Sequence, residues 1–310
     1  MSQNPTISVL IPSFNQAKYL VKTLASVAKQ DYPAAEVIIA DGGSSDETVD
    51  VVRAYGELVT RFHSAPDKGQ LDGLGRALDM ATGDICFWLN SDDVVMPGAF
   101  RTVAKVFQED RALDIVFSDD FAFEEPVRKL SVGATVRFLD FWNHFLFYGQ
   151  MYSECVYWRR SISTQAFPLD YSLRVYTDYS FFLPLRHGRK CRWLSKRLGA
   201  FRARSDSQWV MHREKGEAER GLVKERMRQR LGLSLEDYRK LQCRRYAAFW
   251  LGMKFYPKAQ SALRFASRKL TGDLRRKKVA HWFFDEWLRP PVSLVQNLDL
   301  ALSHASRQDY

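Results

Sequence analysis

The chain has 310 residues, which favours one large α/β domain with an appendage, or two domains, and excludes a short binding peptide. Hydrophobic residues make up 46% of it and charged residues 26%, so wholesale disorder is excluded as well. The formal net charge is +10, and the excess lies in residues 220–289, where 19 Lys and Arg stand against 6 Asp and Glu. The basic character therefore belongs to the C-terminal third.

Short apolar runs alternate with helical patterns over the first 120 residues. The runs predict strands at residues 7–11, 36–40, 58–62, 84–89 and 114–118. The patterns between them predict helices at residues 16–28, 46–55, 71–81 and 98–108. Strands separated by helices indicate right-handed crossovers, so the predicted fold class is α/β with a mainly parallel sheet flanked by helices. In such sheets, ligands bind at the carboxyl ends of the strands.

The rest of the chain divides near residue 212. The middle, to about residue 207, is rich in aromatic residues and predicts a strand at 156–158 and a helix at 176–186. From residue 216 onward the pattern is helical and basic. We therefore expect a first domain over 1–212 and a basic, aromatic-rich helical region over 213–310.

The cysteines and the apolar segments indicate a compartment. Cys86, Cys155, Cys191 and Cys243 are scattered without a C-x-x-C pair, which predicts buried free thiols in a reducing environment. The polar N-terminus has no secretory pattern, and the apolar stretch at 138–149 is too short to cross a bilayer. We expect a soluble cytoplasmic protein.

Acidic residues follow three of the predicted strands. Asp41 ends the second strand region, the pair Asp92 and Asp93 follows the fourth, and Asp119 and Asp120 follow the fifth. Turn chemistry explains part of the Asp41 position, since Asp-Gly-Gly favours a tight turn. Two adjacent carboxylates at an enclosed strand end repel each other unless a cation or strong donors compensate them. A divalent cation shared with substrate phosphates is the simplest compensation.

Several motifs, which follow one another in a fixed order along the chain, resemble those of a known protein family. They are SVLIPSFN at 8–15, LASV with QDYP at 24–33, DGGSSDET at 41–48, PDKGQ at 66–70 and NSDD at 90–93. Together they closely resemble the opening of glycosyltransferase family 2, the inverting enzymes of GT-A fold, a Rossmann-like architecture. The likeness is strong over residues 1–120 and looser to about 208. Several motifs in order over about 100 residues are far more specific than any one of them.

The resemblance implies roles for particular residues. The donor nucleotide would be held by Pro12, Asn15, Asp41, Asp67 and Asp92. Asp93 would bind Mn²⁺ or Mg²⁺ across the donor diphosphate, because charge builds on that group as the bond to the sugar breaks.

An inverting transfer also needs a base for the acceptor hydroxyl, and the family places it at the start of a helix in the second half. Asp178 is the matching candidate, although a first-turn acid or N-cap role favoured by the helix dipole explains the same position. Gln150 and Glu154 match the acceptor-side segment.

Two departures from the family pattern bear on the metal and the base. Ser180 stands at a commonly acidic position, and Arg204 stands where many relatives carry a histidine that completes the metal site. Arginine cannot bind a cation but can bind the donor phosphates directly, which predicts a more weakly held metal.

The basic C-terminal region allows two interpretations. Cationic clusters beside aromatic residues within 220–289 suit an anionic membrane surface, here the inner face of the plasma membrane. A helical subdomain that packs its aromatic face on the first domain fits equally well. No nucleic-acid-binding fold accompanies the charge, so no nucleic acid partner is expected.

The resemblance thus implies a peripheral enzyme that moves a sugar from a nucleotide-diphosphate donor, UDP-linked, to a hydroxyl of a glycan or polyprenyl-linked glycan in bacterial surface polysaccharide synthesis. Two alternatives stay open. One is a catalytically silent nucleotide-sugar-binding or scaffold protein, and the other is a nucleotidyltransferase, which would release pyrophosphate.

Overall fold

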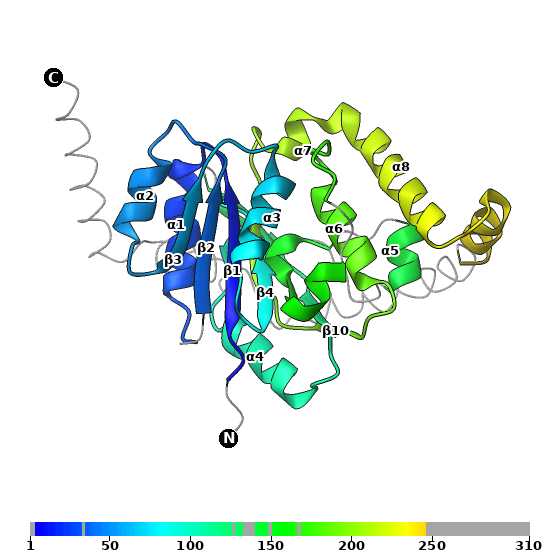
Figure 1. The fold of residues 1–310 in the computed structure, drawn as a ribbon, viewed down its shortest axis with the longest axis horizontal. Helices are drawn as coiled ribbons and strands as arrows, with labels where there is room; N and C mark the ends of the chain where they lie inside the picture. The colour runs from blue at the N-terminus through cyan, green and yellow to red at the C-terminus, as the bar shows by residue number, and fades with distance from the viewer. Residues whose placement is uncertain are drawn as a thin grey trace, which may run out of the picture.

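The computed structural model describes residues 4–32, 35–125, 128–132, 140–147, 151–165 and 169–245. Within them a seven-stranded sheet runs through the molecule with helices on both faces (Figure 1). Its strands are β1 (Ile7–Ser13), β2 (Ala35–Asp41), β3 (Val59–Ser64), β4 (Ile85–Trp88), β6 (Ile115–Ser118), β9 (Val156–Arg159) and β10 (Cys191–Leu194). The helices are α1 (Ala17–Ala28), α2 (Thr48–Ala54), α3 (Gln70–Met80), α4 (Ala99–Glu109), α5 (Phe141–Phe147), α6 (Thr177–Arg186), α7 (Gln208–Met211) and α8 (Arg213–Arg230).

The large sheet is mainly parallel and has the order β10-β6-β9-β4-β1-β2-β3. Neighbouring strands among β4, β1, β2 and β3 pair in parallel, as do β10 and β6. The exception is β9, which is antiparallel to both β4 and β6. Because parallel strands end at the same edge, the loops after β1, β2 and β4 meet at one rim.

Side chains alternate between the two faces of the sheet, as the two-residue period of a strand requires. Val9 and Ile11 pack with α1, α2 and α4, whereas Leu10 packs on the other face with α3 and α6. The aromatic residue Phe87 stacks on Tyr157 across the β4–β9 pair, with ring centroids 4.2 Å apart. Both faces of the central strands β1, β2 and β4 are therefore buried, whereas the edge strand β3 is mostly exposed.

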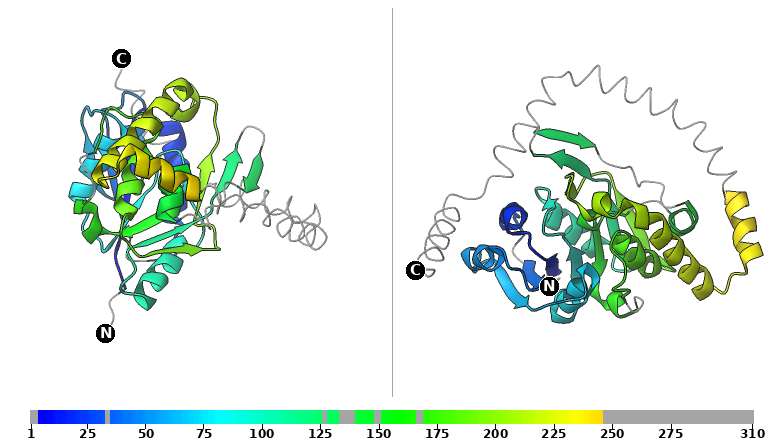
Figure 2. Two further views of the ribbon diagram at one scale, coloured as in Figure 1. Left: turned by 90° about the vertical axis from the view of Figure 1, so that its right-hand side faces the viewer. Right: turned by 90° about the horizontal axis from the view of Figure 1, so that it is seen from above.

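A second, four-stranded sheet has the order β5-β11-β7-β8. Its strands are β5 (Val94–Val95), β7 (Phe121–Glu124), β8 (Lys129–Val132) and β11 (Gly199–Arg202). The hairpin of β7 and β8 stands out from the body of the molecule (Figure 2). Because β5 directly follows Asp93 and pairs with β11, this sheet joins the acidic pair to the segment that ends in Arg202.

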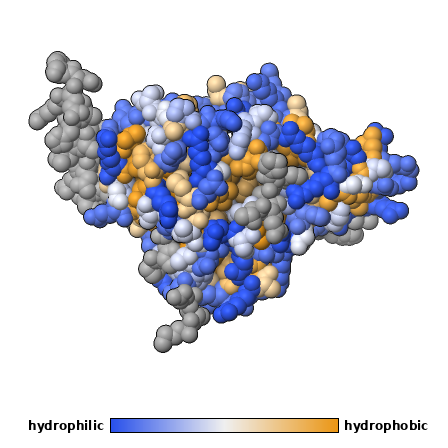
Figure 3. All heavy atoms as spheres, in the orientation of Figure 1, coloured by the Kyte–Doolittle hydropathy of each residue, from blue (hydrophilic) through white to orange (hydrophobic). Residues whose placement is uncertain are grey.

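Helix α8 shares an apolar core with α5 and α6, to which it contributes Val223 and Met227. The outward side of α8 and the helical residues 235–245 are mostly hydrophilic (Figure 3). Packing is thus observed for the described part of the basic region, and residues 246–310 lie outside the described residues. Among the described residues, no helix is long and apolar enough to cross a membrane.

The predicted strands and helices of the first 120 residues are all present, within a few residues of the expected bounds. Helix α2 begins at Thr48 and not at residue 46, because the Asp46 carboxylate accepts a hydrogen bond from the Thr48 main-chain N–H (3.1 Å). The four cysteines are free, as expected. Burial is correct for Cys86 and Cys155 and wrong for Cys243, which is exposed.

Two glycines give a matched stability test. A Cβ added at Gly199 would lie 2.1 Å from the Glu154 carbonyl oxygen, whereas one added at Gly221 in α8 meets nothing within 4 Å. We expect Gly199→Ala to lower the free energy of unfolding by about 3 kcal/mol, because backbone must move. Gly221→Ala should raise it by about 0.5–1 kcal/mol through helix propensity. Urea denaturation checks both, and equal effects would contradict the close approach of β11 to residue 154.

Candidate active site

The site lies at the rim where β4, β1 and β2 end. Ser13 and Asp41 are paired at the ends of β1 and β2, and the acidic pair follows β4. Strand β9 runs antiparallel to β4, so its start lies at this rim. Tyr157, near the start of β9, pairs with Phe87, near the end of β4. Glu154 precedes β9 and Asp93 follows β4, and the antiparallel pairing of these two strands brings both residues to the same rim.

Asp41 organises the loop after β2 and is 1% exposed. Its carboxylate accepts hydrogen bonds from the main-chain N–H groups of Gly43 (3.1 Å) and Ser44 (2.9 Å) and from the Ser64 hydroxyl (2.7 Å). The turn chemistry expected for this residue is thus present. Asn15, with φ of +51°, ties the β1 loop to the β2 loop by accepting from the Ser45 N–H (2.9 Å).

Asp67 lies against the same two loops. A Cβ at Gly42 would come within 2.9 Å of the Asp67 carboxylate, and one at Gly73 would contact both Asp67 and Pro12. Burial, and secondarily the nearby charges of Asp72 and Asp41, raises the pKa of the Asp67 carboxyl. Pro12, Asp41 and Asp67 therefore lie close together where β1 and β2 end.

The acidic pair has two different environments. Asp93 is fully buried, and its carboxylate accepts from the Arg202 main-chain N–H (2.8 Å) and the Asn90 amide (3.2 Å). Burial, together with the charge of Asp92, raises the pKa of Asp93 well above its usual range. Asp92 is partly exposed and forms an ion pair with Arg204 (2.9 Å).

Arg204 and Arg202 flank the ring of Tyr19 in α1. The two guanidinium carbons lie 4.6 Å and 5.1 Å from the ring centroid. Arg204 is mostly buried, which leaves its planar group aligned beside Asp92. An arginine at this position supplies the cationic environment that an anionic substrate group needs.

Glu154 is 1% exposed, and its Oε1 atom has no hydrogen-bond partner among the described residues. Burial raises the pKa of Glu154 well above its usual range, and the charges of Asp93, Asp120 and Asp178 add to the shift. In this conformation the side chain is buried close enough to Asp93, Asp120 and Asp178 for their charges to act on it, and it does not reach the surface. Gln150, the other expected acceptor contact, lies outside the described residues.

Asp178 lies in the first turn of α6 and accepts a hydrogen bond from the Ser153 N–H (3.3 Å). Burial raises the pKa of its carboxyl to about 6, an appropriate value for a base that works near neutral pH. The Ser153 hydroxyl contacts the Asn90 amide (3.1 Å), which also donates to Asp93. Asp178 and Asp93 are thus joined through two intervening side chains.

A second path joins the same two acids. The Thr177 hydroxyl donates to Gln70 (2.7 Å), and the Gln70 amide donates to Asn90 (2.8 Å). The sequence analysis missed Gln70, Asn90, Ser153 and Thr177, although Asn90 and Gln70 belong to the family motifs. Their signal was weak because amide and hydroxyl residues are common in loops.

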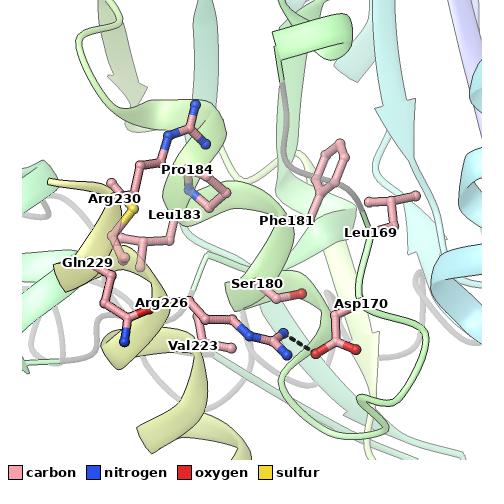
Figure 4. Close-up of a pocket in the computed structure, with 11 residues that line it drawn as sticks. Leu169, Asp170, Ser180, Phe181, Leu183, Pro184, Val223, Arg226, Gln229 and Arg230 are labelled. Atoms are coloured by element: carbon pink, nitrogen blue, oxygen red, sulfur yellow. Dashed lines mark hydrogen bonds and ion pairs between the residues drawn. The ribbon is translucent and has the colours of Figure 1, made fainter.

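A separate cavity of about 530 Å³ lies between α6 and α8 (Figure 4). Its apolar wall includes Phe181 and Leu183, and Asp170 and Arg226 form an ion pair across one side. Ser180, at the commonly acidic family position, faces this cavity. The described residues that line it include none of the candidate site residues.

The acidic site offers oxygen ligands for a divalent cation. No group of three His, Cys, Asp or Glu side chains among the described residues forms a ready metal site. The buried charge of Asp93 and the unpartnered oxygen of Glu154 nevertheless provide hard oxygen donors in need of compensation. These residues fit a metal that Asp93 holds and that takes most of its ligands from a bound diphosphate.

A mainly parallel α/β sheet with acidic residues at its carboxyl rim is the architecture expected of a nucleotide-binding enzyme. The sequence model described as Glycosyl transferase family 2 matches residues 8–158. The chain thus carries a glycosyltransferase family 2 domain over these residues and is a glycosyltransferase.

Curated relatives include a PGL/p-HBAD biosynthesis glycosyltransferase of Mycobacterium tuberculosis, 28% identical over 182 residues, which are 57% of this chain and 68% of the relative. Another is the GalNAc(5)-diNAcBac-PP-undecaprenol beta-1,3-glucosyltransferase of Campylobacter jejuni, 30% identical over 113 residues, 34% of this chain and 35% of the relative.

Solved structures share the fold. S. aureus TarS 1-349 in complex with UDP-GlcNAc has a TM-score of 0.54 and 21% identity, over 66% of this chain and 60% of that one. The mannosyltransferase PcManGT from Pyrobaculum calidifontis, in complex with GDP-Man and Mn2+, has a TM-score of 0.54 and 17% identity, over 100% of this chain and 89% of that one. The predicted α/β fold of GT-A type is confirmed.

Proposed function

We propose that this glycosyltransferase transfers a sugar from a UDP-linked donor, with inversion, to a hydroxyl of a glycan or lipid-linked glycan in bacterial surface polysaccharide synthesis. The name of the Campylobacter relative, which includes PP-undecaprenol, supports a lipid-linked acceptor. The UDP-GlcNAc bound to TarS, which shares the fold, supports a UDP-sugar donor. The observation that carries the proposal is that Asp93 and Asp178, from distant parts of the chain, are linked through Asn90 and Ser153 at one rim.

On the donor side, Pro12 and Asp67 would contact the base and ribose. Asn15 and Asp41 hydrogen-bond the loop after β2, so we propose that they hold this loop in place as well as contact the nucleotide. Asp92 would contact the ribose or a water molecule beside it. Asn15 is exposed, which leaves its amide accessible to a ligand.

Arg204 would donate hydrogen bonds to the donor diphosphate, and Asp93 would hold Mn²⁺ or Mg²⁺. When bound, this cation neutralises the charge that builds on the leaving nucleoside diphosphate. Because Arg204 brings a cation of its own to the site, part of that charge is offset by the protein.

On the acceptor side, Asp178 would take the proton of the attacking hydroxyl. The acceptor oxygen then forms a bond to C1 of the sugar, and the bond from C1 to the phosphate oxygen breaks on the opposite face. The hydroxyl proton stays on Asp178, and the nucleoside diphosphate leaves with the bonding electrons. Glu154 is buried, and its charge acts on Asp93 and Asp178; we propose that it contributes to the acceptor side.

Turnover with a panel of nucleotide sugars, with and without EDTA, tests this function. We expect release of a nucleoside diphosphate, faster with Mn²⁺ than with EDTA and with some activity left in EDTA because of Arg204. Donor binding without turnover would favour a silent binding or scaffold protein. Release of pyrophosphate would favour a nucleotidyltransferase.

We also propose that the basic region 220–289 holds the enzyme at the anionic inner face of the plasma membrane. The hydrophilic outward side of α8 supports this placement (Figure 3). A chain that ends after residue 245 keeps α8 on α6 and is the suitable comparison. The full chain should co-sediment with vesicles that contain anionic lipid. If the shorter chain binds these vesicles equally well, the membrane contact lies in residues before 246.

A further inference from the structure

Glu125 follows β7 at the turn of the β7–β8 hairpin and binds two cations from other elements. Its carboxylate forms ion pairs with Lys22 of α1 and with the guanidinium of Arg202 at the end of β11. Glu125 itself is 24% exposed, whereas Arg202 is 2% exposed. A buried guanidinium depends on its counterion far more than an exposed one does.

Arg202 also contacts both members of the acidic pair, but only through its main chain and the base of its guanidinium. The Arg202 main-chain N–H donates to the Asp93 carboxylate (2.8 Å), and its Nε donates to the Asp92 carbonyl oxygen (2.6 Å). The end of the guanidinium is directed to Glu125 and lies over the ring of Phe123, 4.6 Å from its centroid. The Asp93 carboxylate is thus next to this cation without being its ion-pair partner.

The charges of the three groups already interact. Burial lowers the pKa of Arg202 to about 10, and the charges of Asp93 and Asp92 oppose that shift. If Glu125 lost its charge, the buried guanidinium would need another carboxylate, and Asp93 is the buried one whose charge already acts most strongly on it. An arginine bound to Asp93 would neutralise the group that is to hold a cation.

We propose that Glu125 is a positioning residue for sugar transfer, because it binds the Arg202 guanidinium and so keeps the Asp93 carboxylate available to the donor and its cation. The proposal rests on the proposed function of Asp93. It assigns the β7–β8 hairpin, which stands out from the body of the molecule (Figure 2), a direct effect on the donor site.

The proposal differs from a purely structural ion pair in the effect of a second mutation. Glu125→Gln would free the guanidinium to move to Asp93. Arg202→Met removes the guanidinium but keeps the apolar stem and the main-chain N–H that binds Asp93. The double variant should therefore recover what the single Glu125→Gln variant loses. If the pair only held the hairpin in place, removal of both partners would be at least as harmful as removal of one.

The experiment uses the full chain and measures the Mn²⁺ concentration for half-maximal UDP binding by titration calorimetry, with kcat and KM beside it. We expect Glu125→Gln to raise that concentration at least tenfold and Glu125→Asp to stay within threefold of the wild type. Glu125→Gln with Arg202→Met should return to within threefold. The control is Glu124→Gln, which removes the neighbouring exposed pair with Lys129 and should change nothing.

Two results would overturn this proposal and leave the proposed function intact. One is wild-type Mn²⁺ dependence in Glu125→Gln, and the other is a double variant as impaired as the single one. If Glu125→Gln does not fold, Glu125→Ser alone and together with Arg202→Met takes its place, and the same two outcomes decide the question. A wild-type protein that binds neither UDP nor GDP with Mn²⁺ would instead refute the proposed function, and this proposal with it.

Discussion

Asp178→Asn should remove transfer and spare donor binding. We expect kcat to fall by about 10³-fold, within the range that a positioned general base contributes. The asparagine still accepts the hydrogen bond from the Ser153 N–H, so the local structure should persist. Titration with UDP should give an unchanged dissociation constant. Asp170→Asn, outside the acidic rim, is the matched control, and equal loss in both variants would contradict a specific role for Asp178.

The same residue predicts the pH dependence. Burial raises the pKa of Asp178 to about 6, and the base works only when ionised. The rate of transfer should thus be level above pH 6 and fall about tenfold per pH unit below it. The raised pKa also means that the folded state binds this proton more tightly than the unfolded one, so stability declines as pH rises toward 6. Asp178→Asn removes that penalty, and its Tm at pH 7 should be at least that of the wild type.

Asp93→Asn should cause the second large loss, at least 10²-fold in kcat/KM with Mn²⁺, because the amide cannot hold a divalent cation as a carboxylate does. Its Oδ1 can still accept from the Arg202 main-chain N–H, so folding should be kept. Binding of UDP should weaken in Mn²⁺ and change little in EDTA. Asp50→Asn, on the surface of α2, is the control.

A transfer rate unchanged in Asp93→Asn would exclude a cation at this residue. If instead UDP binding weakened equally in Mn²⁺ and in EDTA, Asp93 would act on the donor without a cation. Measuring UDP binding in Mn²⁺ and in EDTA therefore separates loss of the cation from general damage to the donor site.

The first five strands of the large sheet could be predicted from the sequence because amphipathic helices of regular length separate them, whereas its edge strand β10 was not predicted. The second sheet could not. Its strand β5 has only two residues, Val94–Val95, and pairs with β11, about 100 residues later, so no local period marks it. The positions of Asp93 and Asp178 could be inferred from ordered motifs. The burial of Glu154 and the contacts of Arg202 depend on that second sheet. They could not be predicted because the sequence does not reveal the pairing of β5 with β11.

The shared core of α5, α6 and α8 has a practical consequence for hybrid proteins. Helix α6 carries Asp178, and on its other side Tyr179 and Leu183 are covered by Val223 and Met227. A chain that ends at residue 212 would expose these side chains to solvent. Helix α6, which carries the proposed base Asp178, would then lose part of its packing. Exchanges of C-terminal tails between relatives should therefore be joined after residue 245, where the swapped part leaves the proton acceptor untouched.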